Sequence, residues 1–265
     1  GMAGAAAATV VAEVISGGTY VTLLFKRGLM TSRRLFRVPS WQQLLPLLKG
    51  GAAIQLRTLA LNAAFVTATR RAQMMDSGGV SAAAYAISLQ FWQLSGVSLF
   101  ALQSSASILV PAALARAKDG GPDAARRVAD RLLMLGLTLG VLIGCVQLAS
   151  LPLLSAFSTL PEVTAAATAP VCIASFMTSI AGVVFAGEGI MMGRGAWGHL
   201  ARLTAMASTV MITLLEISRR LDLGLIGVWS AISAFNLVNL GGVLYHHLVI
   251  TPRKEAREAE DAAEK

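Results

Sequence analysis

The chain contains seven runs of predominantly apolar residues, each long enough to cross a bilayer as a helix. A spanning helix needs about 20 such residues, because the hydrocarbon core is ~30 Å thick and a helix rises ~1.5 Å per residue. A buried helix of a soluble protein explains one such run but not seven in succession. The pattern predicts an all-α, polytopic helical membrane protein with about seven transmembrane helices, near 4–25, 50–70, 80–110, 132–154, 167–192, 199–218 and 225–250.

The composition supports the same class of protein. Of the 265 residues, 55% are hydrophobic and 14% are charged, whereas a soluble globular protein carries about 25% charged residues. Disordered, collagen-like and disulfide-stabilised folds are excluded by the dominance of apolar residues, by the absence of a glycine triplet period and by the presence of only two cysteines. The lipid bilayer is therefore the main environment of the chain.

The basic residues are distributed unequally between the loops that alternate along the chain. One set of segments carries 17 of the 22, the other carries four, and Arg57 lies inside an apolar run. Lys and Arg remain on the cytoplasmic side of a membrane, so we expect the N-terminus outside and the C-terminus on the cytoplasmic, stromal or matrix side. Nucleic acid is excluded as a partner, because the basic residues are dispersed rather than forming one patch. The larger set comprises Lys26, Arg27, Arg33, Arg34, Arg37, Lys49, Arg116, Lys118, Arg126, Arg127, Arg131, Arg194, Arg202, Arg253, Lys254, Arg257 and Lys265.

The spacing of the runs predicts four parts of the chain. Residues 1–25 form one helix, 26–49 a basic cytoplasmic linker, 50–250 a six-helix bundle and 251–265 a solvated, charged tail. The linker is the longest basic connection, which suggests that the first helix belongs to a different bundle. Its second half, from Trp41 to Leu48, is expected to lie along the membrane surface.

Three ionisable residues inside the apolar runs are candidates for a function, because a charge within the bilayer is costly. Glu13 lies at the middle of the first run and either carries a transported proton or forms a neutral hydrogen bond to a neighbouring helix. Arg57 lies ~10 Å along its helix from Gly50, and Glu188 lies ~7–8 Å from the same surface, measured from Gly193. Their matching depths predict an ion pair, with either a structural or an ion-coupling role.

Two helices carry polar residues that are candidates for lining a cavity. A polar stripe on a membrane helix must face protein or water rather than lipid, so the alternative is hydrogen bonding between helices. On the third run the stripe consists of Gln90, Gln93, Ser104 and Ser107, and on the seventh the best aligned residues are Ser233 and Asn236.

No arrangement of residues predicts catalysis or a metal site. His246 and His247 have no carboxylate or cysteine near them in the sequence, and GRGAWG after the fifth run lacks the preceding strand and the Lys-Ser/Thr of a phosphate-binding loop. We therefore expect no enzyme activity, no catalytic residues, no bound metal and no cofactor.

Several segments resemble the multidrug and toxic compound extrusion (MATE) transporters, in the DinF-like branch that includes plastid members. GAAAATVVAEVIS, with Glu13, resembles the family's sixth helix, and RTLALNAAFVTATR, with Arg57, resembles the seventh. AISLQFWQLS and ARRVADRLL resemble the eighth helix and the start of the ninth. FAGEGIMMGRGAW, with Glu188, is similar to the tenth, and LGLIGVW to the opening of the twelfth.

The resemblance implies a protein of twelve helices in two six-helix lobes, which exports small organic solutes in exchange for H⁺ or Na⁺. The chain would then be the C-terminal lobe with the last helix of the N-terminal lobe, and the rest of that lobe would be missing from a truncated chain. The coupling ion, H⁺ or Na⁺, would replace any cofactor. The membrane implied is a plastid membrane or the plasma membrane.

Some positions depart from the family's pattern. Tyr85-Ala86 stands where relatives often have His-Gln, Phe100 replaces a frequent Asp, Ser179 and Ala181 replace a Pro-Asn pairing, and Asn239 replaces an Arg. These losses leave a second function open, that of a non-transporting membrane scaffold. A seven-helix receptor is a third alternative, which the topology fits but for which no receptor motif is present.

Overall fold

The computed structural model describes residues 2–28, 40–116 and 121–263, and the chain divides into two compact units, residues 1–49 and 50–265. The first unit contains helix α1 (Met2–Lys26). The described side chains of α1, including Glu13, are almost all exposed. The predicted linker, 26–49, falls partly outside the described residues, and residues 41–49 form the first turns of α3 (Trp41–Gln73).

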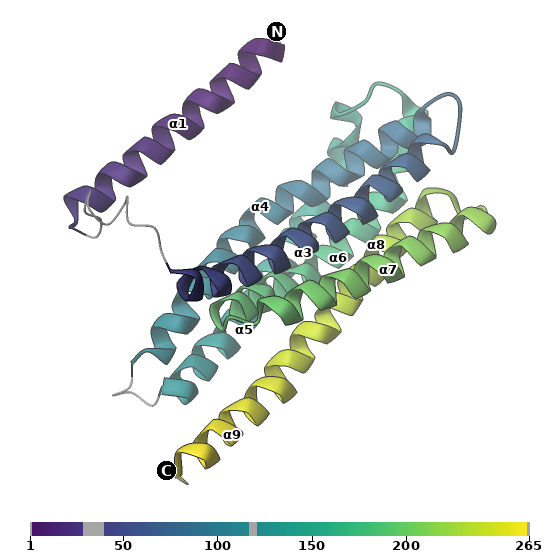
Figure 1. Ribbon diagram of the computed structural model, residues 1–265. Coiled ribbons are helices and arrows are strands. Elements are labelled where there is room, and N and C mark those ends of the chain that lie inside the picture. Colours follow the sequence, from purple (N-terminus) through teal and green to yellow (C-terminus); the bar gives the residue numbers. More distant parts are fainter. Residues whose placement is uncertain (1, 29–39, 117–120, 264–265) are drawn as a thin grey trace. The chain divides into compact units, whose positions relative to one another are not determined.

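The second unit is a helical bundle (Figure 1). After α3 come α4 (Val80–Leu114), α5 (Gly121–Ala149), α6 (Pro161–Gly193), α7 (Trp197–Arg220) and α8 (Gly224–Tyr245). A 3-10 helix, η2 (Leu151–Ala156), joins α5 to α6. A π-helical turn, η3 (His246–Ile250), continues α8 into α9 (Thr251–Ala263), which extends beyond the other helices at one end (Figure 1).

Among the described residues, six helices are long and apolar enough to cross a membrane: Ala6–Lys26, Val80–Leu114, Gly121–Ala149, Pro161–Gly193, Trp197–Arg220 and Gly224–Arg257. The second predicted run, 50–70, forms α3, which is not apolar enough to be counted with these six, because Gln55, Arg57 and Asn62 interrupt its apolar residues. The polytopic, all-helical fold is confirmed. The chain is an integral, multi-pass membrane protein.

The C-terminal segment, predicted as a solvated, charged tail, is helical and largely exposed, with a contact to the bundle at its first turn. Residues 251–263 form α9, a continuation of α8 rather than a free end. Thr251 is buried, and Glu255 Oε1 lies 2.6 Å from Arg194 Nη1 at the end of α6. Composition predicted the charge of this segment correctly but gave no sign of the contact that orders its first turn.

Helix α6 is the centre of the bundle and packs against α4, α5 and α8. Its approach to α5 depends on glycine. A Cβ atom on Gly136 or Gly182 would overlap the backbone carbonyl of the other residue, and one on Gly140 would lie 2.7 Å from the carbonyl oxygens of Thr178 and Ser179. Small residues allow membrane helices to approach to backbone contact, where dispersion forces are strongest.

We expect Gly182→Ala to destabilise the bundle, because the added methyl group meets a backbone carbonyl that cannot move aside. Overpacking of this kind costs about 1–3 kcal/mol, so the melting temperature of the detergent-solubilised protein should fall by several degrees. Gly241→Ala is the matched control, because no atom lies within 4 Å of the added Cβ. Equal melting temperatures for the two variants would contradict the backbone-contact interpretation.

The turn before α4 is stabilised by a carboxylate. Asp76 Oδ1 accepts a hydrogen bond from the Val80 amide at 2.9 Å, and Asp76 Oδ2 accepts one from the Ser81 amide at 2.8 Å. These are two of the amides at a helix start that have no partner within the helix. The hydroxyl and amide of Ser81, followed by the Val80 amide, hold the pKa of the Asp76 carboxyl below its ordinary value.

Asp76 should therefore stabilise α4 in a pH-dependent way. Because the pKa is lower in the folded state, the contribution is complete above about pH 4 and is lost as the pH falls through the lowered pKa. The difference in melting temperature between wild type and Asp76→Ala should shrink between pH 6 and pH 3. Asp261→Ala serves as the control. A difference that does not change with pH would refute this role for the charge.

Candidate functional site: an intramembrane polar network

Arg57 of α3 and Glu188 of α6 form an ion pair inside the bundle, as their matching depths predicted. Arg57 Nη2 contacts Glu188 Oε2, and the side chains are 19% and 8% exposed, respectively. Gly50, in the first third of α3, lies beside the start of α7, since a Cβ on Gly50 would be 3.9 Å from Trp197 Cδ1. Arg57 follows Gly50 by seven residues, so the pair lies about two helical turns from the level of the start of α7, at the end predicted to be cytoplasmic.

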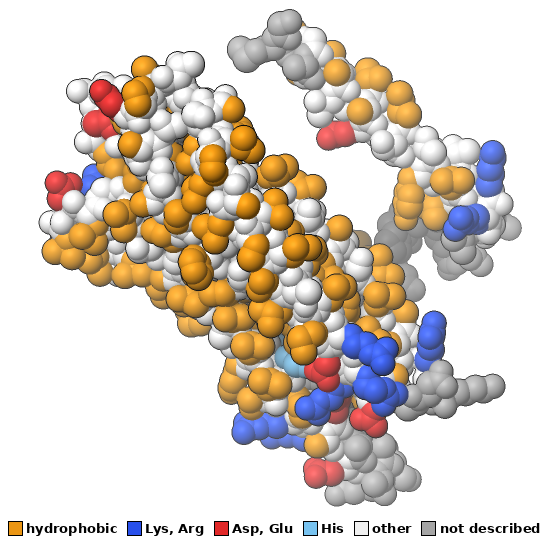
Figure 2. Space-filling view, turned by 180° about the vertical axis from the view of Figure 1, so that it is seen from behind, with side chains coloured by type: hydrophobic (Ala, Val, Ile, Leu, Met, Phe, Trp, Pro, Cys, Tyr) orange, Lys and Arg blue, Asp and Glu red, His pale blue; other side chains and the backbone are white. Residues whose placement is uncertain are grey.

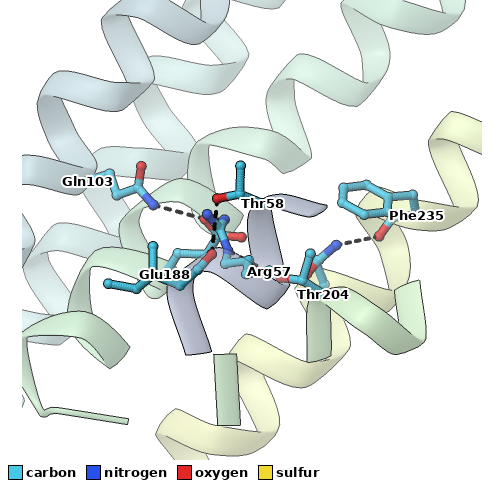
Figure 3. A network of polar contacts seen from close by, with 8 residues as sticks. Arg57, Thr58, Gln103, Glu188, Thr204 and Phe235 are labelled. Atoms are coloured by element: carbon cyan, nitrogen blue, oxygen red, sulfur yellow. Dashed lines mark hydrogen bonds and ion pairs between the residues drawn. The ribbon is translucent and has the colours of Figure 1, made fainter. Parts of the chain in front are cut away.

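A glutamine of α4 completes the surroundings of the carboxylate. Gln103 Nε2 donates a hydrogen bond to Glu188 Oε2 at 2.9 Å, and Gln103 is buried (Figure 3). The same carboxylate oxygen thus accepts a guanidinium donor from α3 and an amide donor from α4. An ionised carboxylate is stable in a low-dielectric interior only when it is paired and hydrogen-bonded.

The guanidinium of Arg57 also reaches α7. Its Nε donates to Thr204 Oγ1 at 3.2 Å, and Thr204 is completely buried. In Figure 3, Thr204 lies on the side of Arg57 that faces Phe235 of α8. The carbonyl of Phe235 accepts a hydrogen bond from Asn239 Nδ2 at 2.9 Å, while Asn239 Oδ1 is buried without a hydrogen-bond partner among the described residues. The network therefore joins α3, α4, α6 and α7 and approaches α8.

Glycines flank Glu188 and admit its neighbours. A Cβ on Gly187 would overlap Val243 of α8, and a Cβ on Gly189 would overlap the Gln103 carbonyl and lie 2.8 Å from Ala106 Cβ, both on α4. The Gly-Glu-Gly sequence thus places a carboxylate where two other helices approach α6 closely. Close packing excludes water and strengthens the electrostatic interaction within the pair.

A second polar cluster lies nearer the opposite end of α5. Gln147 Nε2 donates to the Phe91 carbonyl of α4 at 2.6 Å and to Ser95 Oγ at 2.5 Å. Gln147 Oε1 accepts from Thr178 Oγ1 of α6 at 2.9 Å. One amide side chain thus joins three helices, and this cluster was not predicted from the sequence.

The predicted polar stripe of α4 lies mostly on the exposed face of that helix, away from the face that is buried in the bundle. Gln90, Gln93 and Ser104 are exposed, and Ser107 is partly buried with its hydroxyl bonded to the Ser104 carbonyl at 2.7 Å. The buried polar residues of α4 are Ser88, Ser95 and Gln103. Together with Leu99, Ala106 and Val110 they follow one another at intervals of three, four or seven residues, and this mixture of small, apolar and polar residues was the signal that could have identified the inward face.

The remaining predicted site residues, Ser233, Asn236 and Glu13, do not take part in the Arg57–Glu188 network within the described part of the chain. Ser233 Oγ bonds the Trp229 carbonyl at 2.8 Å, and the buried Asn236 bonds the Ile232 carbonyl at 3.0 Å, both within α8. Glu13 belongs to the other unit and has no ion pair among the described residues. The roles of these residues in ion coupling or in lining a cavity stay predictions.

The two histidines have no carboxylate near them in the sequence, but the fold places one beside His247. Asp130 of α5 lies beside His247, with 2.7 Å between Oδ1 and Nε2, although 117 positions separate them. His246 lies next to His199 of α7, with 5.2 Å between the ring centroids. No group of three or more metal-ligating side chains occurs among the described residues.

The charges separate toward the two ends of the bundle. Arg194, Glu255, His247 and Asp130 form their contacts at the end predicted to be cytoplasmic. At the other end Arg71 lies 3.9 Å from Asp222, and Glu216 pairs with Arg219. Figure 2 shows Lys and Arg gathered at the lower end of the bundle, with hydrophobic side chains over most of the surface between the ends.

The comparisons with known proteins identify the family. The MatE family model matches residues 59–217, from the middle of α3 to the end of α7. The chain belongs to the MatE family. A search of the curated proteins finds no match.

Three solved structures have the same fold as the MatE chain, at 19–23% sequence identity. One is described as a MOP superfamily transporter from Pyrococcus furiosus with a binding pocket of reversed polarity, and it matches at 19% identity with a TM-score of 0.65. An outward-facing multidrug resistance MATE transporter matches at 20% identity and 0.66, and an inward-facing one at 23% and 0.58. The matches cover 70–78% of this chain but only 42–45% of those transporters.

Exchanging the charges of Arg57 and Glu188 tests their pairing. Breaking a buried pair costs about 3–5 kcal/mol, so Arg57→Glu and Glu188→Arg should each lower the melting temperature strongly. The double variant should recover most of the loss. Exchanging Glu216 and Arg219, an exposed pair, should change the melting temperature little. A double variant no more stable than either single variant would show that the two charges do not stabilise each other.

Proposed function

We propose that the chain is the C-terminal lobe, with one preceding helix, of a MATE-type secondary antiporter in the DinF-like branch. It exports small organic solutes in exchange for H⁺ or Na⁺. The observation that carries this proposal is the MatE match over residues 59–217, together with the fold shared with three solved transporters and the buried Arg57–Glu188 pair. The chain spans less than half the length of those transporters, so the proposal includes a second lobe as partner.

The exposed face of α4 supports a solute-binding role. Gln90, Gln93 and Ser104 lie among exposed apolar side chains, including Val97 and Phe100. In a bilayer such polar groups must face protein or water. A largely apolar surface with a few polar groups is typical of sites for small organic molecules. We therefore assign this face to the cavity between the lobes.

The buried charges have different roles in the proposal. Glu188 is already held by Arg57 and Gln103, which supports a positioning role that fixes α3 to α6. Glu13 has no such partner among the described residues, so we assign the coupled ion to this carboxylate. Transporters place binding sites for substrate and coupling ion near the middle of the membrane, between structural repeats.

A non-transporting scaffold is the second candidate function. The observation in its favour is Asn239, which stands where relatives often have Arg and bonds to its own helix. Phe100 likewise stands in the place of a frequent Asp and packs edge-on against Phe185, with 4.9 Å between the ring centroids. Membership of the MatE family excludes the seven-helix receptor.

Flux measurements in proteoliposomes distinguish the two candidates. With the complete reading frame, we expect uptake of cationic or phenolic fluorescent solutes driven by an imposed H⁺ or Na⁺ gradient. Gln90→Ala with Gln93→Ala should raise the KM for the solute several-fold, because polar contacts within an apolar site are lost. Thr138→Ala, at an exposed hydroxyl of α5 bonded to its own helix, is the matched control.

The outcomes separate the parts of this proposal. Flux that is insensitive to the double variant would refute the assignment of the α4 face while retaining transport. Absence of gradient-driven flux with every solute tested, for a protein that melts cooperatively, would refute the antiporter and favour the scaffold.

A further inference from the structure

A cavity of about 530 Å³ lies at the end of the bundle predicted to be cytoplasmic, away from the Arg57–Glu188 pair. The ends of α4, α6 and α8 and the beginnings of α5, α7 and α9 surround it. Its charged and titratable lining residues are Arg194, His199, Arg202, His246, Lys254 and Glu255. With neutral histidines, three cations face one carboxylate, so the cavity carries a net positive charge.

Arg194 lines this cavity and has two hydrogen-bond donors without a partner among the described residues. Its side chain is only 10% exposed, and Nη1 donates to Glu255 Oε1 at 2.6 Å. Nε and Nη2 are both buried and have no hydrogen-bond partner among the described residues. These two N–H groups form one edge of the planar guanidinium, the geometry that holds two oxygens of one anion. A buried donor without an acceptor is costly.

A second lining residue also has a buried polar atom without a hydrogen-bond partner in the described part of the chain. His246 is 6% exposed, and its Nδ1 is buried without a hydrogen-bond partner among the described residues. Its ring lies against His199, which belongs to the first turn of α7. The first amides of a helix and the positive end of its dipole favour a negative ligand. Gly195, Ala196 and Gly198 keep side chains small at this helix start.

We propose that this cavity binds a phosphate group through the free edge of Arg194, with His246, Arg202 and the start of α7 around it. A tetrahedral phosphate presents the paired oxygens that a guanidinium edge recognises. The cavity lies at the end of the bundle predicted to be cytoplasmic, where the apolar spans end, and basic pockets between helices on the cytoplasmic side bind anionic headgroups. The phosphate is carried either by an anionic lipid or by a soluble anion. The site is independent of the proposed transport activity.

Binding measurements on the full chain in nanodiscs test the site and its source. One arm compares phosphatidylcholine discs with discs containing phosphatidylglycerol, by melting temperature and by native mass spectrometry of retained lipid. The other arm titrates inorganic phosphate into phosphatidylcholine discs. We expect a saturable, stabilising interaction in one arm, weakened roughly ten-fold or more by Arg194→Gln, because charge-assisted hydrogen bonds are lost.

Glu255→Gln is the matched variant. Like Arg194→Gln, it abolishes the Arg194–Glu255 ion pair, but it leaves the guanidinium in place and removes the carboxylate from the cavity. Binding should be retained or strengthened. Arg219→Gln, at the opposite end of the bundle, controls for overall charge.

Each outcome has a definite meaning. Binding only in the phosphatidylglycerol arm identifies a lipid phosphate, and binding only in the titration identifies a soluble one. Equal binding by wild type and Arg194→Gln overturns the site. Equal loss of binding in Arg194→Gln and Glu255→Gln also overturns it, because loss of the ion pair alone would then explain the result. Absence of saturable binding in both arms also overturns it.

Discussion

The contact of α6 with its neighbours is made by backbone atoms, and the rest of the bundle depends on that contact. Gly182 meets Gly136 of α5, Gly189 meets the Gln103 carbonyl of α4, and Gly187 meets Val243 of α8. In lipid there is no hydrophobic force between apolar helices, so close packing and hydrogen bonds must hold them together. A side chain at any of these three positions would separate α6 from a neighbour and open the surroundings of Glu188.

Burial of Glu188 follows from this packing and makes its partners obligatory. The carboxylate is placed where water is excluded, so its charge has to be met by protein groups. Arg57 and Gln103 supply them from two helices, and Thr204 accepts from the same arginine. The close packing and the polar network thus depend on each other. Glycines allow the helices to approach, and the buried charges require specific partners, Arg57 from α3 and Gln103 from α4, beside α6.

The length of apolar runs was enough to predict the helices, and depth along each helix was enough to pair Arg57 with Glu188. Gln103, Gln147 and Asp130 were missed for a common reason. Their contacts depend on how each helix is rotated about its own axis and on which helix lies beside it, and neither quantity follows from the residues of one helix alone. The stripe on α4 shows the same limit, because its polar residues were visible in the sequence while the direction in which they face was not. Helix α9 was missed because its composition is that of a solvated tail, and its order begins at a contact with Arg194.

Helix α3 is held differently from the core of the lobe. A Cβ on Gly51 would meet no atom, and the buried face of α3 consists of Ala64, Ala68 and Ala72. Beside these alanines, Phe65 of α3 stacks on Trp92 of α4 with 5.5 Å between ring centroids. By contrast, α4, α5 and α6 are joined by backbone contacts and by the Gln147 cluster. Interfaces packed through backbone contacts, like those among α4, α5 and α6, do not slide continuously. Helices α4, α5 and α6 are therefore expected to move as one body, and the Arg57–Glu188 pair ties α3 to that body through α6.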